Sequence, residues 1–277
     1  MTTATIAELL RSTDLPTLEN RMLLSHTTGL SHVQLISRGN ESLDDASLAA
    51  FNHARARRMS GEPMAYIVGT REFYGRDFSV SPAVLIPRPD TELLIDTALA
   101  LVLPAQAQVL DMGTGSGAIA VTLACERADW RVVGLDVSGA ALAVARDNAA
   151  QLGAHVSLFE SDWFTTLKGS DARFDLIVSN PPYIERDDVH LSQGDVRFEP
   201  RGALTDNADG LSCYRILLND VAEYLVDGGW FMVEHGFDQA LAVRDLFAQA
   251  DLTDVVTLRD LAGHERVTIG RKALDAH

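Results

Sequence analysis

A chain of 277 residues, of which 47% are hydrophobic, is long enough for two domains and can bury a packed core. Its 39 acidic and 23 basic residues give a net charge of −16, which excludes binding of bare nucleic acid through a general basic field but leaves room for a local basic patch. Residues 1–10 lack a basic start and a long apolar run, and the most apolar stretch, 95–104, is too short to span a bilayer. We therefore expect a soluble, cytoplasmic protein without membrane association, with Cys125 and Cys213 as reduced thiols.

Residues 1–64 carry apolar side chains at helical spacing. The pattern predicts a small all-α domain, a bundle of four or five short helices in which no residue looks catalytic. This segment also contains a cationic cluster, which we interpret as a solvated helix face in preference to a docking patch: Arg55, Arg57 and Arg58.

Residues 65–89 differ in character, because aromatic and β-branched residues alternate there with glycine and proline. This pattern predicts a β-hairpin that links the first domain to the rest of the chain. The stretch from Pro87 to Glu92 then predicts the start of a helix that continues to about Val102, because its acidic residues favour a helix N-terminus. The remaining residues, 90–277, form the predicted catalytic domain.

Strand and helix patterns alternate from Gln108 onward. Predicted strands cover 109–112, 132–137, 156–160, 174–179 and 230–234, and helical patterns such as 118–124 and 140–152 separate most of them. The alternation predicts an α/β domain with a parallel, doubly wound, Rossmann-like sheet and helices on both faces. Two final strands, 254–258 and 266–270, joined by a turn at Gly263, predict an antiparallel hairpin at the sheet edge.

A glycine-rich loop follows the first of these strands, with the sequence Asp111-Met112-Gly113-Thr114-Gly115-Ser116-Gly117. Glycines allow a tight turn and let a ligand approach the main chain, so the loop alone fits a dinucleotide, a mononucleotide or S-adenosylmethionine. Asp136 ends the second strand 19 residues after Gly117, where a carboxylate can accept both hydroxyls of a ribose. Asp111 suits the positively charged amino end of S-adenosylmethionine and would repel a pyrophosphate. Both carboxylates could instead be structural caps.

The third strand ends at Ser161-Asp162-Trp163. Asp162 could accept a hydrogen bond from an adenine amino group, and Trp163 could pack on the face of the ring. The alternative for Trp163 is a loop aromatic that seals the edge of the core.

The fourth strand ends in the tetrapeptide Asn180-Pro181-Pro182-Tyr183, which should lie beside the glycine loop because ligands of open parallel sheets bind at the carboxyl ends of the strands. The Asn180 side-chain oxygen can accept from a substrate N–H, and Pro181 has no N–H, so the loop presents acceptors and few donors. Tyr183 offers a face to a flat group. Such a site suits transfer of a methyl group to an amide or exocyclic amine nitrogen, which becomes positive in the transition state. No general base is evident, no metal is needed, and the alternative is a rigid turn.

With these residues in view, the chain resembles the PrmC (HemK) family of release factor glutamine N5-methyltransferases over nearly its whole length. The segments that carry the resemblance are 71–74, 85–92, 113–117, 161–163, 180–183, 194–200, 234–236 and 265–268. Met112 and Ser116 stand where the family often has Leu and Thr. The tetrapeptide alone is less specific, since amino-adenine methyltransferases also carry it.

The resemblance implies a class I methyltransferase fold with strand order 3-2-1-4-5-7-6, S-adenosylmethionine as methyl donor and S-adenosylhomocysteine as product. It implies methylation of the glutamine of the Gly-Gly-Gln loop in class I peptide chain release factors. The helical domain would contact the release factor body, which favours docking by the Arg55–Arg58 cluster somewhat more. We expect the segment Asp195–Glu199 to support the site rather than touch substrate.

Residue pattern and resemblance together predict three sets of site residues. The expected cofactor-binding residues are Asp111, Gly113, Thr114, Gly115, Ser116, Gly117, Asp136, Asp162, Trp163 and Asn180. The expected substrate-binding residues are Asn180, Pro181, Pro182 and Tyr183, of which Asn180, Pro181 and Tyr183 are the catalytic candidates.

Two rival functions remain open. An amino-adenine methyltransferase acting on nucleic acid would need a basic groove and a base-reading domain, whereas this chain is acidic and its extra domain is short and helical. A nucleotide-binding module without activity would explain the glycine loop but would leave Asn180–Tyr183 without a purpose.

Overall fold

The structure, a computed structural model, describes residues 4–12 and 14–274. Its described residues form two compact units. One unit extends to Thr70 and includes Ser192–Phe198, and the other consists of Arg71–Leu191 together with the chain from Glu199 onward. None of the helices in the described ranges combines the length and the apolar character that crossing a membrane requires.

The first unit is helical, as predicted. Its helices are α1 (Ile6–Leu10), α2 (Thr17–Thr28), α3 (His32–Ser37), α4 (Asp45–Met59) and α5 (Met64–Val68). Thr5, Ser31 and Asp44 cap α1, α3 and α4 by accepting a hydrogen bond from the backbone N–H three residues further on. Leucines and one aromatic ring, fully buried, form its core: Leu23, Leu24, Leu35 and Phe51.

The hairpin that follows is shorter than the predicted segment 65–89. It consists of β1 (Thr70–Phe73) and β2 (Arg76–Ser79), whereas Met64–Val68 forms helix α5, whose buried Ile67 belongs to the helical core. The turn at Tyr74 and Gly75 has positive φ at both residues. The rings of Phe73 and Phe78 meet edge to face, with centroids 5.9 Å apart, in the core of the second unit.

The second unit contains a seven-stranded sheet in the order β5-β4-β3-β6-β7-β9-β8. This is the predicted order 3-2-1-4-5-7-6, because the hairpin contributes β1 and β2. The strands are β3 (Gln108–Met112), β4 (Arg131–Asp136), β5 (Val156–Glu160), β6 (Phe174–Ser179), β7 (Leu225–Glu234), β8 (Leu252–Arg259) and β9 (Glu265–Lys272). Strands β3 to β7 are parallel, and β9 runs antiparallel between β7 and β8.

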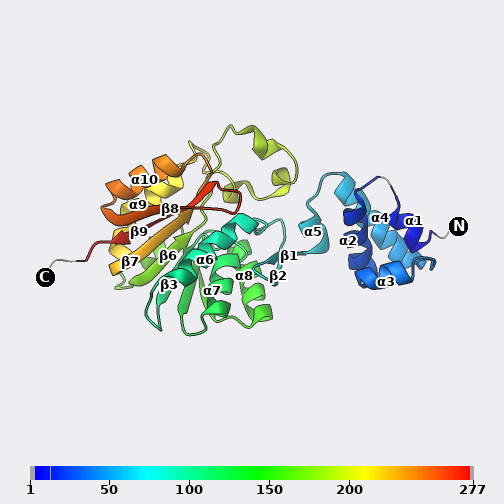
Figure 1. Cartoon of the computed structure of the whole chain (residues 1–277), viewed down its shortest axis with the longest axis horizontal. Coiled ribbons are helices and arrows are strands. Elements are labelled where there is room, and N and C mark those ends of the chain that lie inside the picture. Colours follow the sequence, from blue (N-terminus) through cyan, green and yellow to red (C-terminus); the bar gives the residue numbers. More distant parts are fainter. Residues whose placement is uncertain (1–3, 13, 275–277) are drawn as a thin grey trace. The chain divides into compact units, whose positions relative to one another are not determined.

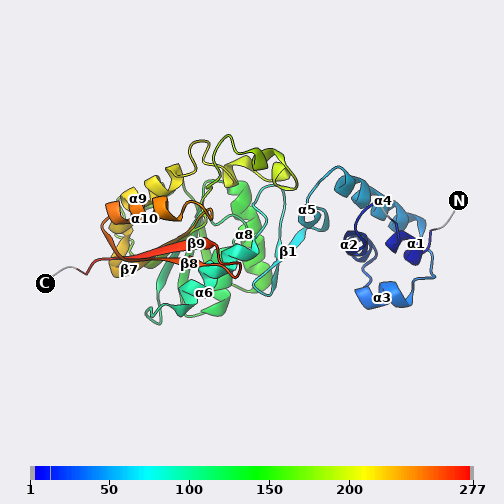
Figure 2. The same cartoon turned by 45° about the horizontal axis from the view of Figure 1, so that its top comes forward.

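Helices cover both faces of this sheet (Figure 1). They are α6 (Glu92–Ala100), α7 (Ala118–Glu126), α8 (Gly139–Leu152), α9 (Ser212–Tyr224) and α10 (Ala240–Gln249), with short 3-10 turns η1 (Pro89–Thr91), η2 (Thr165–Leu167), η3 (Val189–Ser192), η4 (Val196–Phe198) and η5 (Arg201–Ala203). Successive strand residues point to opposite faces. Val109 therefore packs with α6 and α7, whereas Leu110 packs with α9 and α10. Figure 2 shows the same separation, with α6 and α9 on opposite sides of β9.

Candidate active site

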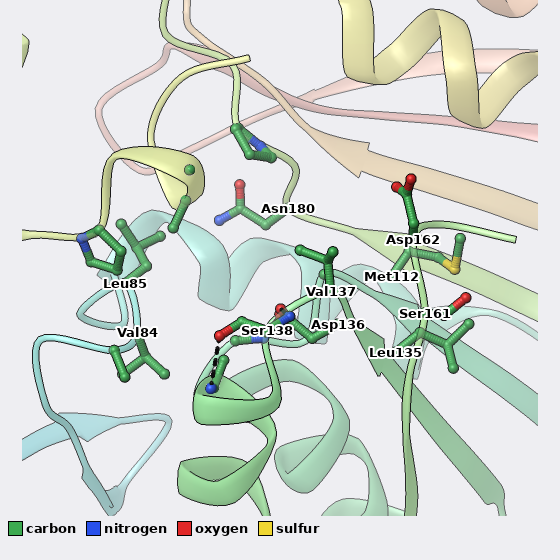
Figure 3. A pocket seen from close by; sticks show the side chains of 18 of the residues that line it. Val84, Leu85, Met112, Leu135, Asp136, Val137, Ser138, Ser161, Asp162 and Asn180 are labelled. Atoms are coloured by element: carbon green, nitrogen blue, oxygen red, sulfur yellow. Dashed lines mark hydrogen bonds between the residues drawn. The ribbon is translucent and has the colours of Figure 1, made fainter. Parts of the chain in front are cut away.

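A cavity of about 260 Å³ lies at the carboxyl ends of β3, β4, β5 and β6. Its walls also include Ala83–Leu85, from the segment after the hairpin, and Pro200, Gly202 and Ala203. In the view of Figure 3, Val84 and Leu85 lie on one side of the cavity and Asp162 on the other, with Asn180 and Asp136 between them. The cavity therefore occupies the place that the topology of open parallel sheets predicts for a ligand.

The glycine loop passes under the cavity as a tight turn tied to β4. The N–H groups of Gly113 and Thr114 both donate to the carbonyl oxygen of Leu135, at 2.8 and 2.9 Å. Gly113 and Gly115 line the cavity, but Thr114, Ser116 and Gly117 do not. Gly117 instead begins α7 with φ +82°, where a Cβ would lie 3.0 Å from Val121 Cγ2. This glycine is needed for the turn and for close packing of the helix.

Asp136 lines the cavity with a carboxylate that the backbone holds on both sides. Gly115 N–H donates to Oδ2 at 2.8 Å and Ser138 N–H donates to Oδ1 at 2.9 Å. Burial raises the pKa of Asp136, against the lowering effect of these bonds. Each oxygen keeps a further lone pair, so the group can still accept from two ligand hydroxyls.

Asp111 does not line the cavity. Its side chain is fully buried beneath the loop, where Oδ2 accepts from the Thr114 hydroxyl at 2.6 Å and from the Ala120 N–H at 3.2 Å. Oδ1 has no hydrogen-bond partner among the described residues, and burial raises the pKa of Asp111 to about 7. The geometry assigns Asp111 to holding the glycine loop against the start of α7.

Asp162 and Trp163 line the cavity at the end of β5. Asp162 is exposed, whereas Trp163 is half-buried and has an unusual positive φ of 48°. The Ser161 hydroxyl donates to the Trp163 carbonyl oxygen at 2.6 Å, which helps to stabilise this conformation. Trp163 also packs against the core beside α9, so sealing of the core edge and contact with the cavity are both realised.

The tetrapeptide after β6 presents two of its four residues to the cavity. Asn180 and Pro182 line it, whereas Pro181 and Tyr183 do not. Asn180 Nδ2 donates to Thr91 Oγ1 at 3.2 Å, and the Tyr183 hydroxyl contacts Glu234 Oε1 at 3.4 Å. Thr91 and Glu234 are both buried, and sequence reasoning missed their link to the tetrapeptide.

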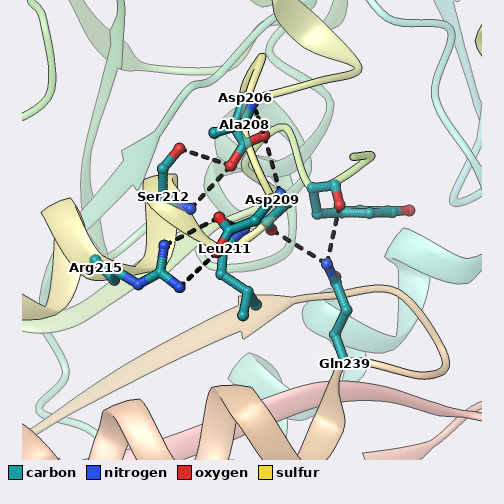
Figure 4. A network of polar contacts seen from close by, with 9 residues as sticks. Asp206, Ala208, Asp209, Leu211, Ser212, Arg215 and Gln239 are labelled. Atoms are coloured by element: carbon teal, nitrogen blue, oxygen red, sulfur yellow. Dashed lines mark hydrogen bonds and ion pairs between the residues drawn. The ribbon is translucent and has the colours of Figure 1, made fainter. Parts of the chain in front are cut away.

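The far end of the tetrapeptide is fixed by a second group of residues that the sequence analysis did not identify. Figure 4 shows two of them, Gln239 and Asp206. Gln239 Nε2 donates to the carbonyl oxygens of Tyr183 and Gly210, at 3.0 and 3.2 Å, while its Oε1 accepts from Gly236 N–H. Asp206 closes the turn that contains Gly210, by accepting from the N–H groups of Ala208, Gly210 and Ser212. The available signal was the run Asp-Asn-Ala-Asp-Gly at 206–210, which is typical of a turn.

Glu199 joins two segments that line the cavity. Its side chain is fully buried, accepts from Ile86 N–H at 3.0 Å and pairs with Arg88. It therefore connects the wall formed by residues 83–85 to the wall formed by residues 200–203.

The cationic cluster of the helical unit is engaged in ion pairs within that unit. Arg55 pairs with Asp14, and Arg57 pairs with Glu62 at 2.6 Å. Arg58 pairs with Glu19 and with Asp195, each at 2.9 Å. Asp195 thus supports the segment to which it belongs, and the guanidinium groups are already occupied by carboxylates.

Comparisons with known proteins agree with this architecture. Residues 3–69 match the PrmC N-terminal domain and residues 89–197 match the Methyltransferase small domain. A release factor glutamine methyltransferase of Neisseria gonorrhoeae is 51% identical over 267 residues, covering 96% of this chain and 97% of that protein. The release factor glutamine methyltransferase of Escherichia coli is 41% identical over 263 residues, covering 95% and 94%. A methyltransferase from Pyrococcus furiosus is 19% identical with a TM-score of 0.55, covers 80% of this chain and 100% of its own, and supports the fold alone. The Neisseria gonorrhoeae and Escherichia coli proteins are 51% and 41% identical to this chain over nearly the whole length of both partners. The chain therefore belongs to the release factor glutamine methyltransferase family.

Proposed function

We propose that the cavity binds S-adenosylmethionine and that the tetrapeptide presents a glutamine side chain to it. Asp136 would accept from the ribose hydroxyls, and Gly113 and Gly115 would allow the ligand to approach the backbone closely. Asp162 and Trp163 would bind the adenine. The fit is supported by Asp136, whose two oxygens are oriented by backbone N–H groups and keep free lone pairs.

The orientation of Asn180 carries the proposal for the chemical step. Because Nδ2 is engaged by Thr91, Oδ1 remains available to accept the N–H of a substrate amide. The bound donor would supply an activated methyl group, whose S–C bond would break as the N–C bond forms, and the methylated nitrogen would lose its proton to water. An acceptor on the amide N–H increases electron density on nitrogen, and this effect grows as the nitrogen becomes positive. The Pro181 carbonyl would be the second acceptor, and Tyr183 would support the loop from behind.

A glutamine of a class I release factor, in its Gly-Gly-Gln loop, is the proposed substrate. The names of the relatives at 41–51% identity favour it over the amino-adenine of a nucleic acid. The net charge of −16 favours a protein partner as well. We further propose a division into a helical domain that includes α5, a linking hairpin and a catalytic domain, in which the helical domain recognises the body of the release factor.

The test is incubation with labelled S-adenosylmethionine and a purified release factor, followed by mass spectrometry of the glutamine-bearing peptide. Asn180→Ala should keep the fold and lower kcat by roughly 100-fold or more, as loss of a transition-state hydrogen bond does elsewhere. Asn219→Ala is the matched control, because Asn219 is exposed on α9, and it should retain activity. Near-normal turnover of Asn180→Ala would reject the role of Asn180, and a methyl group on another residue would overturn the substrate assignment.

A further inference from the structure

A buried polar chain connects the first and last residues of the tetrapeptide behind the cavity. It runs from Asn180 to Thr91 at the end of η1, and from Tyr183 to Glu234 at the end of β7. Thr91 is 4% exposed and Glu234 is 1% exposed, and neither lines the cavity. Burial of two polar side chains in this position calls for a reason, because each loses its hydration on folding.

Thr91 and Glu234 interact with each other as well. The Thr91 hydroxyl lies beside Glu234 and lowers the pKa of its carboxyl, against the larger raising effect of burial. Oε2 of Glu234 has no hydrogen bond of ordinary geometry within the described ranges, so this carboxylate has acceptor capacity to spare. An ionised carboxylate can only accept hydrogen bonds.

The direction of these hydrogen bonds decides which end of the Asn180 amide faces the cavity. A threonine hydroxyl alone can donate or accept, and would tolerate either end of an amide. If Thr91 directs its proton to the unpartnered Oε2 of Glu234, its hydroxyl offers only a lone pair to Asn180. The amide must then turn its NH₂ group to Thr91 and its Oδ1 away from it.

We propose that Thr91 and Glu234 are positioning residues of the methyl transfer reaction, which fix the Asn180 amide with Oδ1 available to the substrate N–H. The inference rests on the proposed role of Asn180 as acceptor. We call the arrangement of Thr91 and Glu234 behind Asn180 the relay. If the relay were lost, the Asn180 amide could turn and present its NH₂ group to the substrate N–H, so that a donor would face a donor. Thr91 belongs to the segment Pro-Arg-Pro-Asp-Thr-Glu, whose threonine thereby gains a function beyond the start of α6.

Ionisation of Glu234 should therefore appear in the rate. Burial raises the pKa of Glu234 to about 7, and only the ionised form, which cannot donate, fixes the direction of the Thr91 hydroxyl proton. The titratable and charged groups that act on it or lie beside it are Asp90 from η1, Arg266 from β9, Tyr183 after β6, Tyr214 from α9 and the adjacent His235. Since the ionised form is the active one, kcat should rise with pH through about 7.

The experiment compares Thr91→Val, Thr91→Ser and Glu234→Gln in the full chain, with a release factor as substrate. Thr91→Val should lower kcat by roughly 10- to 100-fold, the usual cost of misplacing a reacting group. For Thr91→Val, both the KM for S-adenosylmethionine and the affinity for it measured by calorimetry should stay within about twofold of the wild-type values, because Thr91 does not line the cavity. Thr91→Ser retains the hydroxyl and should recover most of the activity. Thr97→Val is the control, because the one hydrogen-bond partner of the Thr97 hydroxyl among the described residues is the Leu93 carbonyl oxygen of its own helix.

The pH profile separates positioning from mere structural support. The ratio of wild-type to Glu234→Gln kcat should rise from pH 6 to pH 8, since only the wild type gains the oriented amide as Glu234 ionises. A constant ratio, or a Thr91→Val enzyme as active as Thr97→Val, overturns the inference. If Asn180→Ala is inactive while Thr91→Val is fully active, the relay is rejected and the proposed function stands. If Asn180→Ala is active, the proposed function itself fails.

Discussion

Replacing Glu199 with glutamine changes one buried atom and removes a buried negative charge. Oε1 of the new side chain can still accept from Ile86 N–H, but its NH₂ group then faces the guanidinium of Arg88, donor against donor. Arg88 is 35% exposed, so water can solvate it after the change, and the full cost of a stranded buried charge does not apply. The change removes one charge-assisted hydrogen bond, which contributes about 1.5–3 kcal/mol. A neutral amide costs less to bury than a carboxylate, and this difference offsets part of the loss. We therefore expect a loss of about 2 kcal/mol in the free energy of unfolding.

That loss corresponds to a decrease of roughly 4–8 °C in Tm for a domain of this size, measurable by scanning calorimetry. The control is Asp129→Asn, which breaks the exposed pair with Arg127, whose side chains are 44% and 32% exposed. Exposed pairs contribute little, so its Tm should change by about 2 °C or less. If Glu199→Gln melts within that same small range, Glu199 does not join the two walls of the cavity as argued.

Two further substitutions test the floor of the cavity. Burial raises the pKa of Asp111 from 3.8 to about 7, so the folded chain binds this proton more tightly than the unfolded chain, and wild-type stability should fall as pH rises through that interval. Relative to wild type, Asp111→Asn should gain about 3 kcal/mol in unfolding free energy between pH 5 and pH 8 in urea titrations, and a constant difference would contradict this. Gly117→Ala combines left-handed strain with a Cβ 3.0 Å from Val121, and should cost about 2–4 kcal/mol. Gly153→Ala, with a similar φ of +68° and no atom within 4 Å of its Cβ, should cost clearly less in the same assay.

The sheet could be predicted from the sequence because its signals are local. Each strand is a short apolar run, and the first four predicted strands end within one residue of the observed ends. The fifth predicted strand, 230–234, is only the second half of β7, which begins at Leu225. Its first half contains Asp227, Gly228 and Gly229, which read as a turn, and the pairing with β6 shifts register there, from Leu225 opposite Phe174 to Trp230 opposite Leu176. The strand order came from resemblance, since spacing alone does not decide which strands are neighbours.

The supporting residues could not be predicted because their partners are distant in sequence. Thr91 lies 89 residues before Asn180, and Glu234 lies 51 residues after Tyr183. Asp111 shows the converse limit, because its position at a strand end fits both a ligand contact and a structural role. The structural role is distinguished from the ligand contact only in the folded chain. There Asp111 is buried and accepts hydrogen bonds from the Thr114 hydroxyl and the Ala120 N–H.

A common principle connects these supporting contacts. Three groups that face the cavity are each held by a hydrogen bond from the surrounding chain: Asp136 by backbone N–H groups, the Trp163 loop by Ser161, and Asn180 by Thr91. Methyl transfer from a sulfonium to an amide nitrogen needs no covalent intermediate, so the protein contributes mainly alignment and oriented dipoles. Such dipoles are effective only if they are already fixed before the substrate arrives, because reorientation during the reaction would consume the gain. The free-energy cost of fixing these dipoles is then met during folding. This explains why buried polar residues, which weaken the core, are retained behind this cavity.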